Sequence, residues 1–139
     1  MEFKKHILII EDDEVILSLL KELLESENYY ISTAENGEIA LELLSEKKPK
    51  PDLILLDLMM PVMNGFQFMK KQSEDPEIKN IPVVVMSADS QIKEKLRDTT
   101  AVTFFRKPVK IATIIEIIER LTAVQVLTKD LKTFSHDLD

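Results

Sequence analysis

Residues 51–61 read PDLILLDLMMP, and the centre of this segment is the strongest indication of the fold class. Four consecutive apolar residues, Leu53–Leu56, lead directly into Asp57. A strand that is apolar on both faces is typical of a parallel sheet covered by helices on both sides. We therefore expect a buried strand here, with a carboxylate at its C-terminal end.

Four further apolar runs have the length of strands: Ile7–Ile10, Tyr29–Thr33, Pro82–Met86 and Val102–Phe105. The second of these runs has a mixed composition, which favours an edge strand. Segments with helical periodicity separate the runs. The weakest helical pattern lies in Ser90–Arg97, and Pro108 suits the first turn of the last helix. Alternating strands and helices predict an α/β fold: five β-α units in a doubly wound parallel sheet.

Length, charge and cysteine content limit the classes of function. The chain has 139 residues, no cysteine and a net charge of −7, and this length allows one domain. The absence of cysteine excludes a disulfide framework, a Cys-ligated zinc and a thiol nucleophile. The negative charge argues against a nucleic-acid binder, and the longest charge-free run, Leu58–Met69, is too short to span a membrane. We expect a cytoplasmic protein with no nucleic-acid or membrane partner.

Reactive side chains follow four of the five expected strands. Glu11 and Asp12 follow the first strand, and Asp57 ends the third. Ser87 follows the fourth strand, and Lys107 lies just beyond the fifth. The C-terminal ends of parallel strands lie at one edge of a sheet, where ligands bind. With the strand order 2-1-3-4-5, the three acidic residues converge at the centre of that edge.

Converging carboxylates require a shared proton or a cation. Two carboxylates ~4 Å apart repel each other by roughly 4 kcal/mol at an effective dielectric constant of about 20. An all-oxygen site with room for water suits Mg²⁺. The hydroxyl of Ser87 and the ammonium of Lys107 beside such an ion would receive a phosphoryl group, and Asp57 could attack the phosphorus atom.

Five segments resemble the receiver domains of two-component response regulators, in a layout similar to the single-domain chemotaxis regulator (CheY-like, flavodoxin-like). They are residues 6–13 (HILIIEDD), 34–41 (AENGEIAL), 51–61 with Asn64-Gly65, 83–88 (VVVMSA) and 104–108 (FFRKP). Each segment alone is a weak signal, but all five in this order and spacing are specific. The resemblance implies a receiver domain over residues 4–123. A C-terminal helical extension or a frayed tail would follow over residues 124–139.

The resemblance also implies a role for each residue of the acidic edge. Asp57 would be the phosphoacceptor, with a histidine kinase or a phosphotransfer protein as the donor. Asp12, Asp57 and the backbone carbonyl of Met59 would ligate Mg²⁺, and Glu11 would bind the ion through a water molecule. Lys107 would contact the phosphoryl oxygens, and its peptide bond to the following proline would be cis.

Ser87 and Phe104 match the switch pair of that family. On phosphorylation the hydroxyl would move to the phosphoryl group and the aromatic ring would turn inward. This would change the face formed by the fourth helix, fifth strand and fifth helix, where receivers meet partners. The downstream target would be a protein, and this face or the C-terminal tail would support a homodimer. Thr99-Thr100-Ala101 lacks the glycine of the family pattern, so the fourth helix is expected to be short, shifted or irregular.

Three functions remain open at this point. The first is a phosphorylated signalling switch, which is not an enzyme beyond its own phosphotransfer and autodephosphorylation. The second is a receiver-like adaptor that acts without phosphorylation, and the third is a Mg²⁺-dependent aspartyl phosphohydrolase. Met59 stands two residues after Asp57, where the third function would need an acid. An apolar Met59 also predicts slow hydrolysis of the phosphorylated form.

Asp13 is expected to cap the first helix rather than bind metal.

Overall fold

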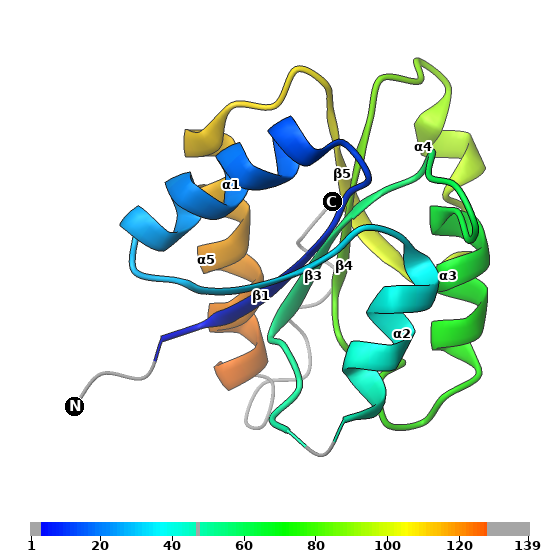
Figure 1. The fold of residues 1–139 in the computed structure, drawn as a ribbon, viewed down its shortest axis with the longest axis horizontal. Helices are drawn as coiled ribbons and strands as arrows, with labels where there is room; N and C mark the ends of the chain where they lie inside the picture. Colours follow the sequence, from blue (N-terminus) through cyan, green and yellow to red (C-terminus); the bar gives the residue numbers. More distant parts are fainter. Residues whose placement is uncertain (1–3, 47, 128–139) are drawn as a thin grey trace.

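The computed structural model describes residues 4–46 and 48–127, which form three layers (Figure 1). A sheet forms the middle layer. The helices α1 (Glu14–Ser26) and α5 (Ile111–Leu127) cover one face of it. The other face carries α2 (Gly37–Ser45), α3 (Gly65–Ser73) and α4 (Ile92–Lys95). No helix within the described ranges is long and apolar enough to cross a membrane.

The sheet is parallel throughout, and its strand order is β2-β1-β3-β4-β5. The strands are β1 (His6–Ile10), β2 (Tyr30–Ala34), β3 (Leu53–Asp57), β4 (Val83–Ser87) and β5 (Ala101–Arg106). Every residue of β3 and β4 is buried, as their apolar composition predicts. The predicted fold, the strand order and the edge position of the second strand are all confirmed.

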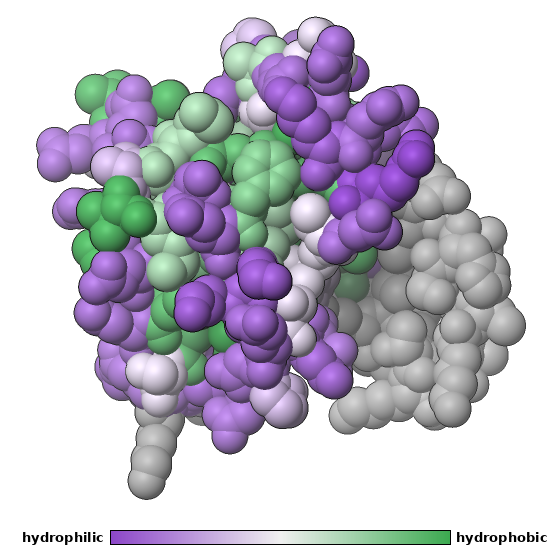
Figure 2. All heavy atoms as spheres, turned by 90° about the vertical axis from the view of Figure 1, so that its right-hand side faces the viewer, coloured by the Kyte–Doolittle hydropathy of each residue, from purple (hydrophilic) through white to green (hydrophobic). Residues whose placement is uncertain are grey.

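The alternation of side chains along the strands divides the core into two parts. Ile7 and Ile9 of β1 pack with Leu24 of α1 and Ile118 of α5 on one face. Their neighbours along β1 face the opposite way and pack with α2, α3 and α4. Burying each such side chain stabilises the fold by about 1.5–3 kcal/mol. Partly buried hydrophobic residues extend the part of the core under α2, α3 and α4 toward the surface. Figure 2, viewed from the side of these helices, shows hydrophobic areas between hydrophilic ones.

The length of α4 and the start of α5 can be compared with the predictions from the sequence. The four-residue α4 confirms the prediction of a short helix, and Asp98 after it has a φ of 67°, a conformation that glycine adopts more easily. The predicted position of Pro108 in the first turn of α5 is wrong. The carbonyl of Lys110 accepts the first helical hydrogen bonds, from the amides of Thr113 and Ile114. The helix therefore begins at Ile111, and Pro108 lies before it in a cis peptide bond with Lys107.

The C-terminal end of α5 bears on the predicted extension. The helix continues past residue 123 to Leu127, so the first four residues of the expected 124–139 segment are helical. The remaining part, residues 128–139, lies outside the described residues. Its contribution to an extension or to a dimer stays a prediction.

Candidate functional site

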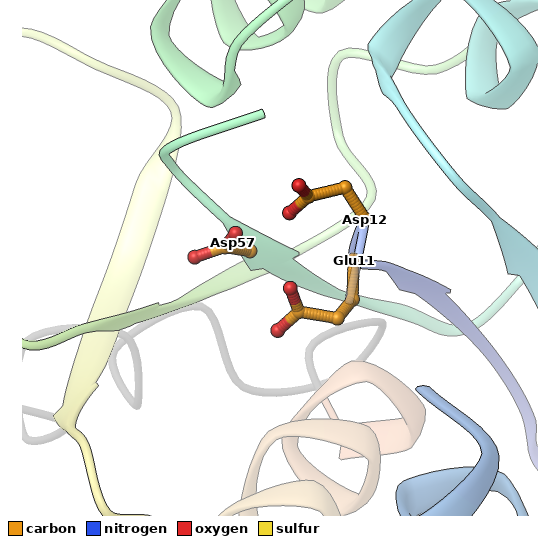
Figure 3. Close-up of side chains that lie close together, drawn as sticks. All are labelled: Glu11, Asp12 and Asp57. Carbon is orange, nitrogen blue, oxygen red and sulfur yellow. The ribbon is translucent and has the colours of Figure 1, made fainter. Parts of the chain in front are cut away.

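The ends of the two central strands bring three carboxylates together. β1 and β3 are neighbours, with Ile10 paired to Leu56, so the acidic residues that end or follow these strands lie side by side. One carboxylate oxygen from each of Glu11, Asp12 and Asp57 lies within 4.8 Å of the others (Figure 3). This is the only such acidic cluster in the part of the chain that the structure describes. The convergence expected from the strand order is therefore present.

The three carboxylates differ in their exposure to solvent. Glu11 is only 1% exposed and Asp57 only 6%, whereas Asp12 faces solvent. Burial of two acids at one place is costly unless a counter-charge is present. The cluster thus has an enclosed side, formed by Glu11 and Asp57, and an open side at Asp12 through which an ion or a phosphodonor could enter.

Lys107 supplies the counter-charge in this structure. Its Nζ lies 3.2 Å from Asp57 Oδ1 and 3.3 Å from Glu11 Oε1. Its backbone N–H donates to the carbonyl of Ser87 (2.9 Å), which fixes the end of β5 beside the end of β4. Burial alone would lower the pKa of Lys107, but the charges of Asp57 and Glu11 outweigh burial and raise it. The ammonium therefore stays charged beside the phosphoacceptor candidate.

The pKa of Glu11 shows how strongly the site needs positive charge. Burial, followed by repulsion from Asp57, raises this pKa from 4.5 to about 7. The Asp13 backbone N–H donates to Glu11 Oε2 (3.3 Å) and opposes the rise, as does Lys107. Near neutral pH a proton and a cation therefore compete for the carboxylates. A cluster of three carboxylates with one open side fits Mg²⁺, which takes oxygen ligands and keeps several waters.

Asp13, next to the cluster, has a structural role. Its Oδ1 accepts hydrogen bonds from the backbone N–H groups of Val15 (2.9 Å) and Ile16 (3.2 Å). These are the first-turn amides of α1, which have no partner within the helix. The prediction that Asp13 caps the first helix is confirmed.

The remaining predicted residues surround the cluster at different depths. Ser87 is buried at the end of β4, and its Oγ accepts the backbone N–H of Asp89 (3.0 Å). Phe104 on β5 is half-buried and packs against the part of the core that faces α2, α3 and α4. Met59 follows β3 and is 78% exposed, so its side chain contributes little to the packing of the site. The structure brings Ser87 to the same sheet edge as Asp57 and places Phe104 further back along β5.

Asp89 links the turn after β4 to α4 and to β5, a role that was not predicted from the sequence. Its Oδ1 accepts the backbone N–H of Gln91 (2.8 Å), and its other carboxylate oxygen pairs with Lys95 of α4. Its backbone carbonyl accepts a hydrogen bond from Arg106 Nη1 (3.4 Å), whose guanidinium lies 5.8 Å from the centre of the Phe104 ring. The hydrogen bond from Lys95 is the main cause of a lowered pKa at Asp89. The turn after β4 is thus bonded to both α4 and β5.

Comparison with known proteins identifies the family. The model of the response regulator receiver domain matches residues 7–119. The chain belongs to this family. The receiver domain is 33% identical over 128 residues to the response regulator PleD of Caulobacter vibrioides; the match spans 91% of the chain but only 28% of PleD. The polar-differentiation response regulator DivK of Brucella anthropi is 32% identical over 117 residues, which are 83% of this chain and 94% of DivK.

Solved structures agree with this assignment. A signal receiver domain of a histidine kinase from Syntrophus aciditrophicus superposes with a TM-score of 0.77 at 30% identity, covering 86% of this chain and 90% of that domain. The chemotaxis protein CheY4 of Vibrio cholerae gives the same TM-score at 25% identity, covering 86% of this chain and 99% of CheY4. Receiver domains are signalling phosphoacceptors that interact with histidine kinases or phosphotransfer proteins, and they bind Mg²⁺ at an acidic pocket. In this chain Glu11, Asp12 and Asp57 form an acidic cluster whose oxygens lie close enough together to hold a metal ion.

Proposed function

We propose that this receiver domain is a phosphorylation-dependent switch whose phosphoacceptor is Asp57. The observation that supports this most directly is the position of Asp57, buried at the end of the central strand β3 and 3.2 Å from the Lys107 ammonium. Two further acids lie beside it. The phosphoryl donor is a phosphohistidine of a histidine kinase or a phosphotransfer protein.

The phosphotransfer itself needs a nucleophile, charge neutralisation and a leaving group. A carboxylate oxygen of Asp57 attacks the phosphorus atom and forms the P–O bond of an acyl phosphate. The P–N bond of the donor breaks, and the imidazole nitrogen leaves with the bonding electron pair. The Lys107 ammonium, already bonded to Asp57, moves to the phosphoryl oxygens and stabilises their charge. A positioned ammonium in a half-buried site stabilises this charge better than solvent does.

The acidic pocket would hold Mg²⁺ for this reaction. Asp12, Asp57 and the backbone carbonyl of Met59 are the proposed direct ligands, and Glu11 is the proposed ligand through water. When bound, the ion neutralises the carboxylates and the incoming phosphoryl group. The burial of Glu11 and its raised pKa support this arrangement, because a buried acid gains from a nearby cation.

Ser87 and Phe104 are the proposed switch residues. The Ser87 hydroxyl lies at the sheet edge of Asp57 and is bonded to the turn that carries Asp89. Movement of this hydroxyl to a phosphoryl group would pull on that turn, which is bonded to α4 through Lys95 and to β5 through Arg106. The half-buried Phe104 ring lies next to Arg106 and would turn inward when the turn moves. The face formed by α4, β5 and α5 is therefore the proposed surface for the downstream protein, and a homodimer would form there or through the C-terminal tail.

Intact mass after incubation with acetyl phosphate tests the proposal. We expect the mass of one phosphoryl group to be added in the presence of Mg²⁺, and not in EDTA or in Asp57→Asn. Asp13→Asn is the matched control, because Asp13 belongs to the same acidic run but caps α1; it should be phosphorylated like the parent. An unmodified parent with an intact fold would instead support the phosphorylation-independent adaptor. Rapid multiple turnover of the donor would support the phosphohydrolase.

A further inference from the structure

A cavity of about 330 Å³ lies at the sheet edge opposite the acidic pocket. It is bounded by His6 and Tyr30, the first residues of β1 and β2, and by the C-terminal end of α2. Residues 48–51, which lead from α2 toward β3, close its remaining side. The acidic pocket follows the C-terminal end of the same strand β1, so the two sites lie toward opposite ends of that strand.

The interior of the cavity is mainly apolar. Leu8 and Leu44, which are nearly inaccessible to solvent, line it together with Leu43, Pro49 and Pro51. Small-molecule sites typically combine an apolar lining with a few polar groups. At about 30 Å³ for each water-sized group, the volume holds roughly eleven non-hydrogen atoms. This is the size of a single substituted ring.

One wall of the cavity is aromatic and polar. The rings of His6 and Tyr30 lie 4.7 Å apart between centroids, and Tyr30 is 58% exposed, which is high for an aromatic residue. His6 Nε2 and Ser32 Oγ are 2.7 Å apart and share a hydrogen bond. Burial lowers the pKa of His6 although Asp52 opposes the change, so the imidazole is neutral at pH 7. The wall therefore offers ring surface and hydrogen-bonding groups but no charge.

The charge of the cavity comes from lysines. Its lining contains Lys4, Lys48 and Lys50 but a single acid, Glu46, which pairs with Lys48 (3.2 Å). Lys50 donates to the backbone carbonyls of Leu44 (2.5 Å) and Glu46 (3.1 Å) at the end of α2. Among residues 4–46 and 48–127, neither Lys4 nor Lys50 forms an ion pair with a carboxylate. A positive site on a chain with a net charge of −7 selects an anionic ligand.

We propose that this cavity binds a small aromatic carboxylate. Its ring lies on Leu8 and Leu44 beside the exposed ring of Tyr30, and its carboxylate lies between the Lys4 and Lys50 ammoniums. The apolar volume accounts for the ring, and Lys4 and Lys50, which have no carboxylate partner among the described residues, account for the anion. This site is distinct from the acidic pocket, and its occupation does not require phosphorylation of Asp57.

Titration with phenylacetate, followed by the backbone amide signals in ¹H–¹⁵N NMR spectra, tests this proposal. We expect saturable shifts confined to residues 4–8, 30–32, 43–46 and 48–51, with a dissociation constant of about 1 mM or below. The matched ligand 2-phenylacetamide has the same shape without the charge and should bind at least about tenfold more weakly. Equal binding of the two ligands would overturn the assignment of an anion site. Shifts spread over surface lysines, or no saturation, would overturn the site itself.

Three variants separate the contributions of charge and shape. The double variant Lys4→Met/Lys50→Met should weaken phenylacetate binding at least about tenfold, whereas Lys21→Met, an exposed change on α1, should leave it unchanged. Leu43→Trp should abolish binding of both ligands, because Leu43 lines the cavity and a larger side chain fills it. Thermal unfolding verifies that each variant is folded. Undiminished binding in a folded Leu43→Trp variant would refute the proposal.

Discussion

Replacing Glu11 with Gln removes a buried charge from the acidic pocket while keeping the size of the side chain. In the folded protein the pKa of Glu11 is about 7 instead of 4.5, because burial and then Asp57 disfavour its carboxylate. A pKa difference of one corresponds to about 1.4 kcal/mol. The difference at Glu11 therefore lowers the free energy of unfolding by roughly 3 kcal/mol once the side chain is fully ionised.

The sign of the effect follows from proton binding. Between pH 4.5 and about 7 the folded protein holds the Glu11 proton and the unfolded chain releases it. The unfolded chain then binds fewer protons, so stability falls as the pH rises through this window and levels off above it. Gln does not titrate, so Glu11→Gln lacks this loss. We expect the variant to exceed the parent by about 1 kcal/mol at pH 5 and by about 3 kcal/mol at pH 8.

Urea unfolding followed by circular dichroism measures this difference, in EDTA and at several pH values from 5 to 8. Glu22→Gln, an exposed change on α1, is the control: it keeps Glu11, so its stability should fall with pH as that of the parent does. Adding Mg²⁺ at pH 8 should stabilise the parent more than Glu11→Gln. A difference that stays constant with pH, or a variant that is less stable than the parent at pH 8, would refute the electrostatic explanation of the pocket.

Three other substitutions test separate parts of the structure. Met59→Asn should speed the decay of phosphorylated Asp57 several-fold, measured by intact mass over time, because the amide can orient the hydrolytic water; an unchanged decay contradicts this role. Asp13→Ala should lower the free energy of unfolding by about 1 kcal/mol through loss of the α1 cap, measured in urea. In Gly65→Ala the new Cβ would lie 2.9 Å from the Asp57 carbonyl oxygen and 2.7 Å from Leu58 Cδ2. Thermal unfolding should then show a loss of about 1–3 kcal/mol, with slower phosphorylation by acetyl phosphate, and an unchanged melting temperature would show that the backbone adapts.

The strand order and the acidic pocket were predictable because they depend on short segments whose chemistry is visible in the sequence. The continuous apolar residues of β3 indicate a strand buried on both faces, and a carboxylate after such a strand must lie at the sheet edge. The cap at Asp13 was predictable for the same reason, since it involves amides only two and three residues away.

Features that depend on long-range contacts could not be predicted in this way. Arg106 and Asp89 are joined across 17 residues, and His6 and Ser32 meet because β1 and β2 are paired. The start of α5 was misjudged because proline preference favours Pro108 in the first turn, whereas the carbonyl of Lys110 begins the helix. The roles of the individual site residues were inferred from the family resemblance and not from the spacing of the residues.

The brevity of α4 has a consequence for how its face could respond to a signal. A four-residue helix has almost no stability of its own, because helix nucleation is unfavourable. It is held in place from outside, by the pair between Lys95 and Asp89 and by the burial of Ile92 and Leu96 in the core. A force that withdraws these two side chains would unwind α4 instead of shifting it as a rigid rod. The face would then respond through an order–disorder transition, and a partner that recognises a helix there would have to provide the ordering free energy itself.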